Sequence, residues 1–206
     1  MATSDVGKPA ASARERILTA AYDLFSRRGI RAVGTEEVID RAGVAKATLY
    51  RHFATKNDLV LAVLQRREEV WTYGLIEEQS RRRGEMPEEQ LLAIFDVMHE
   101  WAALRDGYEG CSFINVLLEL GPDSPAGQAC ITHIDNVRDI VRQRAVAAGL
   151  TDVEDFASSW HILMKGAIVL AAVGDRNAAL RARRMAIALI EEHRPVAPEN
   201  LGEAAS

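Results

Sequence analysis

Two cysteines, Cys111 and Cys130, are all that this chain of 206 residues contains, and they have no Cys-x-x-Cys spacing. A disulfide framework and a zinc module are therefore not indicated. Long hydrophobic runs are scarce too, since a run such as Ala167–Val173 is far shorter than the roughly 20 residues that span a bilayer. The first eight residues lack the apolar core of a secretory signal. We therefore expect a cytoplasmic protein with no membrane partner.

Catalytic signatures are also missing from the sequence. The chain has no glycine-rich phosphate loop and no metal motif such as His-Glu-x-x-His. Cys111, His133 and Asp135 would supply a nucleophile, a base and an orienting acid. However, His133 and Asp135 lie two positions apart on an expected helix and point in different directions. We expect no enzyme, no cofactor and no metal site.

The charge of the chain is unevenly distributed. The overall net charge of −5 argues against a nucleic-acid partner for the chain as a whole. Residues 1–56, however, carry ten basic and six acidic side chains, a net charge of +4, so the remaining 150 residues carry −9. A basic end on an acidic body suggests that the N-terminal segment meets a polyanion.

The pattern of apolar residues predicts helices throughout. Hydrophobic residues make up 48% of the chain, enough for one compact domain or for a small domain joined to a larger one. They recur three and four positions apart in nearly every stretch. We expect an all-α protein of about nine helices and no sheet. The expected helices span about 12–28, 35–42, 46–52, 55–80, 87–105, 111–120, 125–148, 152–173 and 176–193.

Local signals support these boundaries. Ser12–Glu15 and Thr55–Asp58 have the form of capping boxes. Pro87 favours the first turn of a helix. Gly29 suits a helix end and Gly43 suits a tight turn, because glycine tolerates positive φ.

The segment Glu36–Phe53 is the most informative part of the chain. Its first half buries Val38, Ile39 and Ala42, and Gly43 permits a sharp turn. Val44 and Leu49 fill the gap between the two helices, and Leu49 and Phe53, four positions apart, point inward. The second helix is left with six exposed residues: Lys46, Ala47, Thr48, Tyr50, Arg51 and His52. Small residues let such a helix enter the major groove, while hydroxyls and cations meet phosphates and base edges.

The sequence Ala42–Phe53, followed by Lys56 and Leu59, resembles the DNA-binding domain of the TetR family of bacterial regulators over about residues 14–64. The resemblance implies an all-helical homodimer that binds double-stranded, palindromic operator DNA. It also implies dimerisation through the last two helices and, by default, a repressor that a small-molecule effector releases. The candidate DNA-binding residues are Thr35, Lys46, Ala47, Thr48, Tyr50, Arg51, His52 and Lys56.

The sequence departs from the family pattern at two places. Ile39 stands where many relatives have alanine, and Glu36-Glu37 places acid where relatives often have a basic or neutral residue. The acids suit the positive end of the helix dipole, but they put a DNA contact by Glu36 in doubt.

The resemblance leads to a linear domain plan. Residues 1–11 would be a flexible N-terminal arm, and 12–58 the helix-turn-helix DNA-binding domain. Residues 59–195 would form a helical domain for effector binding and dimerisation, followed by a flexible tail over 196–206. Gly110–Asn115, with Glu119 beyond it, also resembles a Gly-Cys-x-Phe-x-Asn…Glu pattern found in one subset of TetR-like effector domains.

A ligand would bind among aromatic, sulfur-containing and histidine side chains of the middle helices. The candidates are Trp71, Phe95, Met98, His99, Phe113, His133, Trp160 and Met164, with Trp101 nearby in the sequence. The alternative is that they are core, since aromatic and methionine residues at helical spacing usually pack inside a protein.

The last two helices carry apolar stripes that suit a four-helix dimer interface. The stripes comprise Phe156, Trp160, Leu163, Met164, Ala167 and Ala171 on one helix, and Ala178, Ala182, Met185, Ala186 and Leu189 on the other. The alternative is that these side chains are buried within the same chain.

The function also has an alternative. A DNA-dependent architectural or partner-binding protein would use the same fold, and its DNA sites would be scattered over the chromosome.

Overall fold

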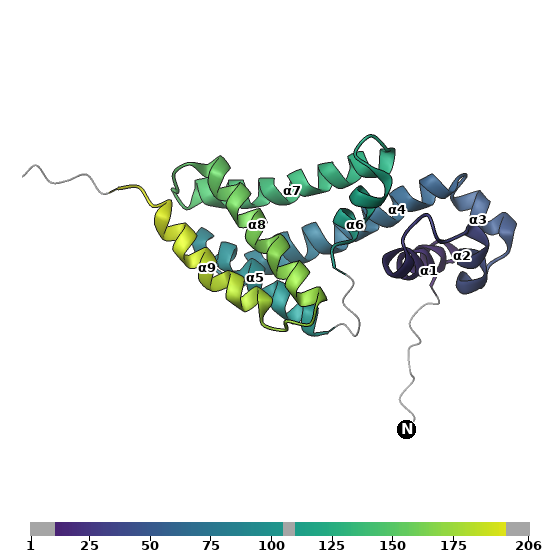
Figure 1. Cartoon of the computed structure of the whole chain (residues 1–206), viewed down its shortest axis with the longest axis horizontal. Helices are drawn as coiled ribbons and strands as arrows, with labels where there is room; N and C mark the ends of the chain where they lie inside the picture. Colours follow the sequence, from purple (N-terminus) through teal and green to yellow (C-terminus); the bar gives the residue numbers. More distant parts are fainter. Residues whose placement is uncertain (1–10, 105–109, 197–206) are drawn as a thin grey trace, which may run out of the picture. The chain divides into compact units, whose positions relative to one another are not determined.

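The computed structural model describes residues 11–104 and 110–196, and in these residues it contains nine α-helices, one π-helix and no strand (Figure 1). The helices are α1 (Ala13–Arg28), α2 (Thr35–Ala42), α3 (Lys46–His52), α4 (Lys56–Glu68), η1 (Glu69–Gln79), α5 (Pro87–Ala103), α6 (Ser112–Leu120), α7 (Pro125–Ala147), α8 (Val153–Ala172) and α9 (Ala178–Glu192). The predicted all-α fold is confirmed. The predicted arm and tail lie outside the described residues, apart from Ala11 and Val196.

Of the two predicted capping boxes, the one at Thr55–Asp58 is complete, whereas the one at Ser12–Glu15 forms only its Ser12 half. Thr55 and Asp58 form the reciprocal capping box of α4, with N–H···O distances of 3.1 and 2.9 Å. The Ser12 hydroxyl accepts from the Glu15 N–H (3.2 Å), while the Glu15 carboxylate pairs with Arg66 (3.3 Å). Because these signals act within one turn of the chain, the sequence predicts them well.

The helix after Thr55 differs from the single α-helix predicted over 55–80. It is α-helical up to Glu68 and then continues as η1, a π-helix, in which hydrogen bonds join residues five apart instead of four. Val70–Gly74 is a run of residues with weak α-helix propensity. The buried side chains of this segment are Trp71, Thr72, Ile76 and Ser80, and they recur four and five residues apart. Because a π-helix has a wider turn than an α-helix, this spacing places them on one side of the helix.

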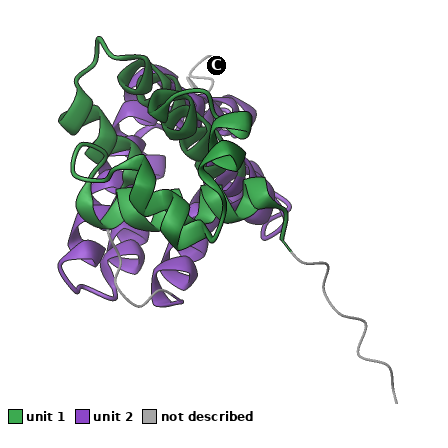
Figure 2. Cartoon of the chain, turned by 90° about the vertical axis from the view of Figure 1, so that its right-hand side faces the viewer, with its two compact units in different colours: residues 1–69, 111–133 green, residues 70–110, 134–206 purple. Residues whose placement is uncertain are grey.

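The chain forms two compact units, coloured separately in Figure 2. Unit 1 comprises the residues up to Glu69 together with Cys111–His133, and unit 2 comprises Val70–Gly110 and the residues from Ile134 onward. This division differs from the expected boundary at residue 58. The reason is that α4 and α6 both contribute to the hydrophobic core of unit 1, a packing that no linear pattern reveals.

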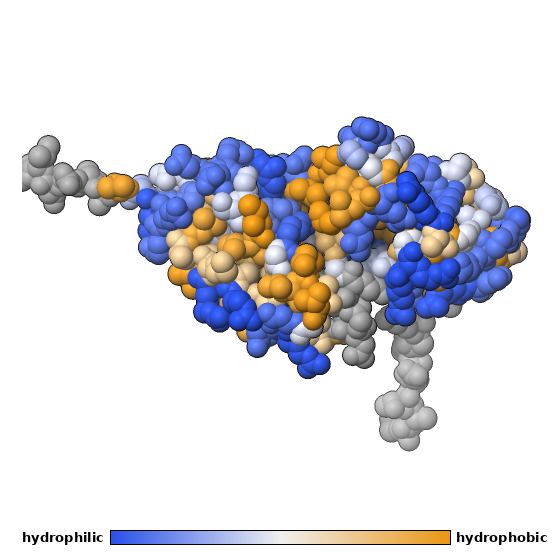
Figure 3. All heavy atoms as spheres, in the orientation of Figure 1, coloured by the Kyte–Doolittle hydropathy of each residue, from blue (hydrophilic) through white to orange (hydrophobic). Residues whose placement is uncertain are grey.

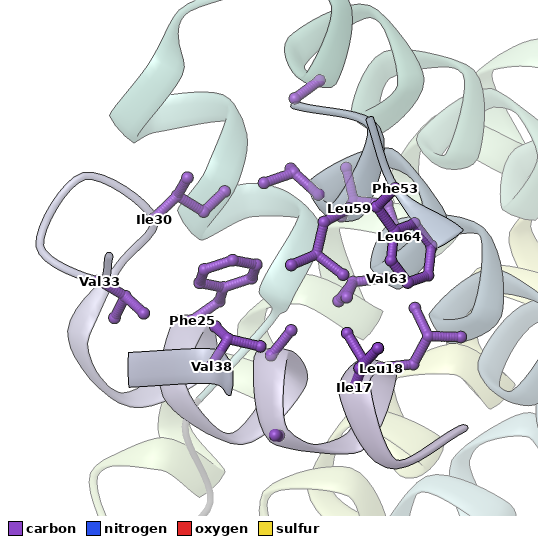
Figure 4. Close-up of a cluster of buried hydrophobic side chains, with 14 of the residues drawn as sticks. Ile17, Leu18, Phe25, Ile30, Val33, Val38, Phe53, Leu59, Val63 and Leu64 are labelled. Atoms are coloured by element: carbon purple, nitrogen blue, oxygen red, sulfur yellow. The ribbon is translucent and has the colours of Figure 1, made fainter. Parts of the chain in front are cut away.

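Unit 1 is built on α1, which contacts α2, α3 and α4. Figure 4 shows side chains of α1, α2 and α4, together with Phe53 directly after α3, pointing into one cluster. Its buried members include Ile17, Leu18, Phe25, Val38, Leu49, Phe53, Leu59 and Leu64. Burying a side chain of this size contributes about 1.5–3 kcal/mol. Helices as short as α2 and α3 are not stable alone, so this burial holds them in place.

In unit 2, α9 contacts both α5 and α8. Phe95 of α5 and Phe156 of α8 lie with their ring centroids 5.1 and 5.3 Å from that of Trp160. In the described parts of the chain, no helix is long and apolar enough to cross a membrane.

The predicted apolar stripes of α8 and α9 are mostly buried inside the protomer. The buried members are Phe156, Trp160, Met164, Ala167, Ala178, Ala182 and Ala186, whereas Leu163, Ala171 and Leu189 are half-buried and Met185 is exposed. The prediction that these stripes form the dimer interface is therefore wrong for the buried members. The reason is that α5, α8 and α9 bury these side chains against one another.

A second set of apolar side chains on the same two helices is exposed instead. It comprises Ile162, Val169 and Leu170 on α8, Val173 directly after the end of α8, and Met185 and Ile187 on α9. Figure 3 shows apolar atoms along α8 on the surface of unit 2. We call this set the exposed α8–α9 face.

A buried arginine ties three segments of unit 2 together. Arg144 of α7 donates from Nη1 to Ser80 Oγ (2.6 Å) and to the Gln90 carbonyl (3.0 Å). From Nη2 it donates to the carbonyls of Glu77 (2.8 Å) and Ile76 (3.4 Å). These carbonyls lie near the end of η1, where a helix has few backbone donors left for its own acceptors, and the Ser80 hydroxyl also donates to the Ile76 carbonyl. Burial lowers the pKa of Arg144 to about 10, so the guanidinium stays charged at neutral pH.

We expect Arg144→Met to destabilise the protein by about 3 kcal/mol, because it removes the charged donor that the carbonyls of Glu77 and Gln90 share. The measurement is denaturant unfolding at fixed protomer concentration. Arg142→Met is the matched control, since Arg142 lies two residues away and pairs with Glu154 and Asp139 at the surface. It should change stability little. Equal losses in the two variants would contradict the role given to Arg144.

Candidate nucleic-acid interface

A tight turn around Gly43 joins α2 to α3. Gly43 adopts the left-handed conformation (φ 61°, ψ 47°), which glycine reaches without steric cost. Its N–H donates to the Asp40 carbonyl (3.2 Å), and the Val44 N–H donates to the Ile39 carbonyl (3.3 Å). These bonds close α2 and direct the chain into α3, as the sequence predicts.

The inner faces of α2 and α3 pack into the core of unit 1. Val38 and Leu49 are completely buried, and Ile39, Ala42 and Phe53 are nearly so. The Phe53 N–H donates to the Leu49 carbonyl (2.9 Å) and ends α3. The predicted inward side of the helix-turn-helix is confirmed.

The opposite face of α3 is open to solvent. Five of its predicted outward residues are exposed and one is half-buried: Lys46, Ala47, Tyr50, Arg51 and His52, with Thr48 the half-buried one. Ala47 and Thr48 are small, which allows the helix to approach base edges closely. The side chains beside them supply cations and hydroxyls for phosphates.

Lys46 forms an ion pair across the helix-turn-helix. Its Nζ lies 2.6 Å from Glu36 Oε1, and both side chains are about two-thirds exposed (63% and 66%). The hydrogen bond to Glu36 raises the pKa of Lys46 above its usual value, so the ammonium is charged at neutral pH. Because exposed pairs of this kind are weak, a phosphate can replace Glu36 as the partner of Lys46.

Thr35 and Tyr50 join α2 to α3 through their hydroxyl groups. The Thr35 Oγ1 lies 3.2 Å from the Tyr50 Oη. Both hydroxyls lie at the start of α2, where backbone N–H groups lack helical partners and the helix dipole favours a negative group.

Lys56 is the first residue of α4, and its side chain reaches back to the loop between α1 and α2. Its Nζ donates to the Ile30 carbonyl (2.5 Å). An ammonium has three donors, so this bond orients Lys56 and leaves donors for a phosphate.

The eight predicted ligand-binding residues are divided between the units, and most are buried. Phe113 and His133 are buried in unit 1; Trp71, Phe95, Met98, Trp160 and Met164 are buried in unit 2, where His99 is half-buried. Phe113 and His133 stack with ring centroids 3.3 Å apart, and Trp71 packs against Trp101 (4.7 Å). The His99 Nδ1 lies 3.1 Å from the Arg176 carbonyl. Most are thus packed inside their units, and their role in ligand binding stays a prediction.

Two of the residues considered for catalysis, His133 and Asp135, contact different partners. The His133 Nδ1 lies 3.6 Å from a Glu68 carboxylate oxygen, and Asp135 lies 3.5 Å from Arg138. Cys130 is the second cysteine of the chain besides Cys111, and burial raises the pKa of its thiol to about 12. Within residues 11–104 and 110–196, no three histidine, cysteine or acidic side chains are placed to hold a metal ion.

The helix-turn-helix region is similar in sequence to known proteins. Residues 17–63 match the model of a family described as bacterial regulatory proteins, tetR family. Over 53 residues the chain is 53% identical to the HTH-type transcriptional activator FasR of Mycolicibacterium smegmatis, covering 26% of this chain and 24% of the relative. Over 107 residues it is 27% identical to an uncharacterized HTH-type transcriptional regulator of Lactococcus lactis, covering 52% and 54%. The chain thus matches about a quarter to a half of the length of these curated relatives.

Known crystal structures extend the likeness to most of the chain. A TetR-family transcriptional regulator from Streptomyces coelicolor has a TM-score of 0.82 at 25% identity, covering 89% of this chain and 96% of that chain. A TetR-type regulator from Streptomyces avermitilis has a TM-score of 0.76 at 26% identity, covering 89% and 98%.

The geometry of α2, its turn and α3 defines a helix-turn-helix protein. Together with the match at residues 17–63 and the fold shared with TetR-family regulators at 25% and 26% identity, it supports the assignment to the TetR family of bacterial regulatory proteins. The resemblance stated from the sequence is confirmed.

Two polar contacts of this region were missed by reasoning from the sequence. Lys46 and Glu36 pair although they lie on different helices. Glu119 of α6 accepts hydrogen bonds from the backbone N–H groups of Ile30 (2.8 Å) and Arg31 (2.6 Å). The Gly-Cys-x-Phe-x-Asn…Glu pattern marked Glu119, but its partners are almost ninety positions away in the chain.

We expect Lys46→Ala and Tyr50→Ala each to leave the protein folded and to weaken DNA binding about tenfold, because each removes a contact to phosphate or base. Fluorescence anisotropy with labelled DNA measures the affinity, and circular dichroism checks the fold. Arg82→Ala is the matched control, because Arg82 is also an exposed cation paired with one carboxylate, Glu78, but lies in unit 2. Unchanged affinity in both helix variants would refute the assignment of α3.

Proposed function

We propose that this protein is a transcriptional regulator that binds a palindromic operator in double-stranded DNA as a homodimer. Its default action is repression, and a small molecule bound among the C-terminal helices releases the operator. A protein with this task works in the cytoplasm, where bacterial DNA lies. No enzymatic step belongs to the proposed function.

The observation that carries the proposal is the exposed face of α3 opposite the buried Leu49. This face combines small residues with cations and hydroxyls, the composition needed for major-groove recognition. The net charge of +4 over residues 1–56 adds long-range attraction to a polyanion. The relatives and solved structures reported above carry the names of transcriptional regulators, which supports the same conclusion.

The exposed α8–α9 face supports the dimer. Ile162, Val169 and Val173 are each more than half exposed, and such a cluster of apolar side chains is typical of an interaction site. Beside Ile162, an open apolar groove runs between α8 and α9, and Met185 and Leu189 contribute to its lining. A second copy of the same face would fill the groove around a twofold axis.

A dimer is also what a palindromic operator requires. Two recognition helices read two half-sites when they lie about one helical turn of DNA apart, roughly 34–36 Å. A ligand that binds better to a different arrangement of the protomers changes that separation. It acts only through its difference in affinity for the two states. Trp71, Phe95, Phe113 and Trp160 remain candidates for contacting such a ligand.

Activation is a second candidate for the regulatory outcome. The relative that is 53% identical over 53 residues is named an activator. The DNA-binding domain determines which site is bound, whereas the position of that site relative to a promoter decides between repression and activation. Measuring transcription from a bound promoter with and without the protein distinguishes the two.

The test of the function is a salt-titrated binding assay on DNA fragments recovered from a genome-wide binding selection, beside random DNA of equal length. We expect two protomers per palindromic site and selective binding that weakens steeply with salt. Equal, weak binding to all DNA would contradict the proposal. Sites scattered across the chromosome without relation to promoters would instead favour the architectural alternative.

Charge placed in the exposed α8–α9 face should prevent dimerisation. We expect Ile162→Glu to yield a folded monomer, because the dimer would bury an unpaired carboxylate. Sedimentation or light scattering gives the mass. Val146→Glu is the matched control, since Val146 is a comparably exposed apolar residue on α7. A dimer that persists in the Ile162 variant would show that the interface lies elsewhere.

A further inference from the structure

A carboxylate from α6 binds the loop that follows α1. The two oxygens of Glu119 accept separately: Oε2 from the Ile30 N–H (2.8 Å) and Oε1 from the Arg31 N–H (2.6 Å). Hydrogen bonds to an ionised acceptor are stronger than those between neutral groups. One side chain thus holds two consecutive backbone groups within unit 1.

Gly29 makes room for this carboxylate. A Cβ at that position would lie 3.0 Å from Glu119 Oε2 and 3.2 Å from Oε1. Gly29 also has a φ of +82°, which other residues rarely adopt. The chain between α1 and α2 is therefore shaped to receive Glu119.

The same peptide group connects Glu119 to Lys56. The amide between Ile30 and Arg31 donates its N–H to Glu119 and accepts at its carbonyl oxygen from the Lys56 Nζ (2.5 Å). A carboxylate on the N–H side polarises the amide and strengthens the carbonyl as an acceptor. Glu119, the peptide and Lys56 form one chain of hydrogen bonds.

We propose that Glu119 is a positioning residue for DNA binding, which orients the Lys56 ammonium toward an operator phosphate by fixing the peptide between Ile30 and Arg31. The inference rests on the proposed function, because it takes Lys56 as a phosphate contact. A lysine is flexible and loses rotamer freedom when it binds. Glu119 reduces that loss by holding the acceptor that orients Lys56 before DNA arrives.

A purely structural role for Glu119 has different consequences. It would lower stability without altering the affinity of the folded protein, and its effect would not depend on Lys56. The two roles are separated by a double-mutant cycle measured on DNA affinity rather than on unfolding.

The cycle uses Glu119→Gln, Lys56→Ala and the double variant, with DNA selected by the unaltered protein and at a temperature where all are folded. We expect Glu119→Gln to weaken binding about tenfold, which corresponds to 1.4 kcal/mol. In the Lys56→Ala background the same change should have no further effect, and both single variants should show a shallower salt dependence. Glu88→Gln is the matched control, because the Glu88 carboxylate binds Arg194 in unit 2; its affinity should equal that of the unaltered protein.

Unchanged DNA affinity in Glu119→Gln would overturn the inference. So would a loss of affinity in the double variant that equals the product of the losses in the two single variants. If the unaltered protein does not bind DNA selectively, the proposed function fails first, so the two failures are distinguishable. Hydrogen exchange of the unaltered protein tests the inference if Glu119→Gln does not fold. Operator DNA should slow exchange at the amides of Ile30 and Arg31, because linkage is reciprocal. Unaltered exchange at both amides would contradict the proposal.

Discussion

The burial of Leu49 and Phe53 in the core of unit 1 is the contact on which the DNA-binding surface depends. A helix of seven residues such as α3 does not form alone, because too few hydrogen bonds offset the cost of ordering the first turn. Its stability comes from the apolar side chains of α1, α2 and α4 packed behind it. The same burial fixes which way α3 turns, so Lys46, Tyr50 and Arg51 face solvent together. A recognition surface that is rigid before binding loses less entropy when it meets DNA.

Apolar packing sets the shape of this surface, and charged side chains set its attraction to phosphate. The Lys46–Glu36 pair places an acid beside the predicted contact face. An acid at this position reduces the positive charge that the face offers to phosphate. Lys56 is held differently, through the backbone of Ile30 and from there by Glu119. In the proposed function the two lysines therefore have distinct roles: Lys46 would exchange Glu36 for a phosphate, whereas Lys56 would be oriented before DNA binds.

Signals that act over a few residues allowed much of the fold to be predicted from the sequence. The Thr55–Asp58 capping box, the turn at Gly43 and the start of α5 at Pro87 all lie where the local chemistry placed them. The family followed from Ala42–Phe53, where inward and outward residues occur at fixed spacing. Contacts between distant segments could not be obtained this way. Periodicity revealed an apolar face on α8 but could not show that Phe156 and Trp160 pack inside while Ile162 and Val169 stay exposed. Neither could it find the partners of Glu119 or the π-helix that places Trp71 and Ile76 on one side.

The central claim, that DNA is read by the outer face of α3, is tested most directly by mapping backbone amide chemical shifts of the isotopically labelled protein as operator DNA is added. The account predicts that the largest changes fall at Thr35, at residues 46–52 and at Lys56, with the α8–α9 face little affected. If these amides stay unperturbed while another surface responds, α3 is not the DNA-binding element and the account is wrong.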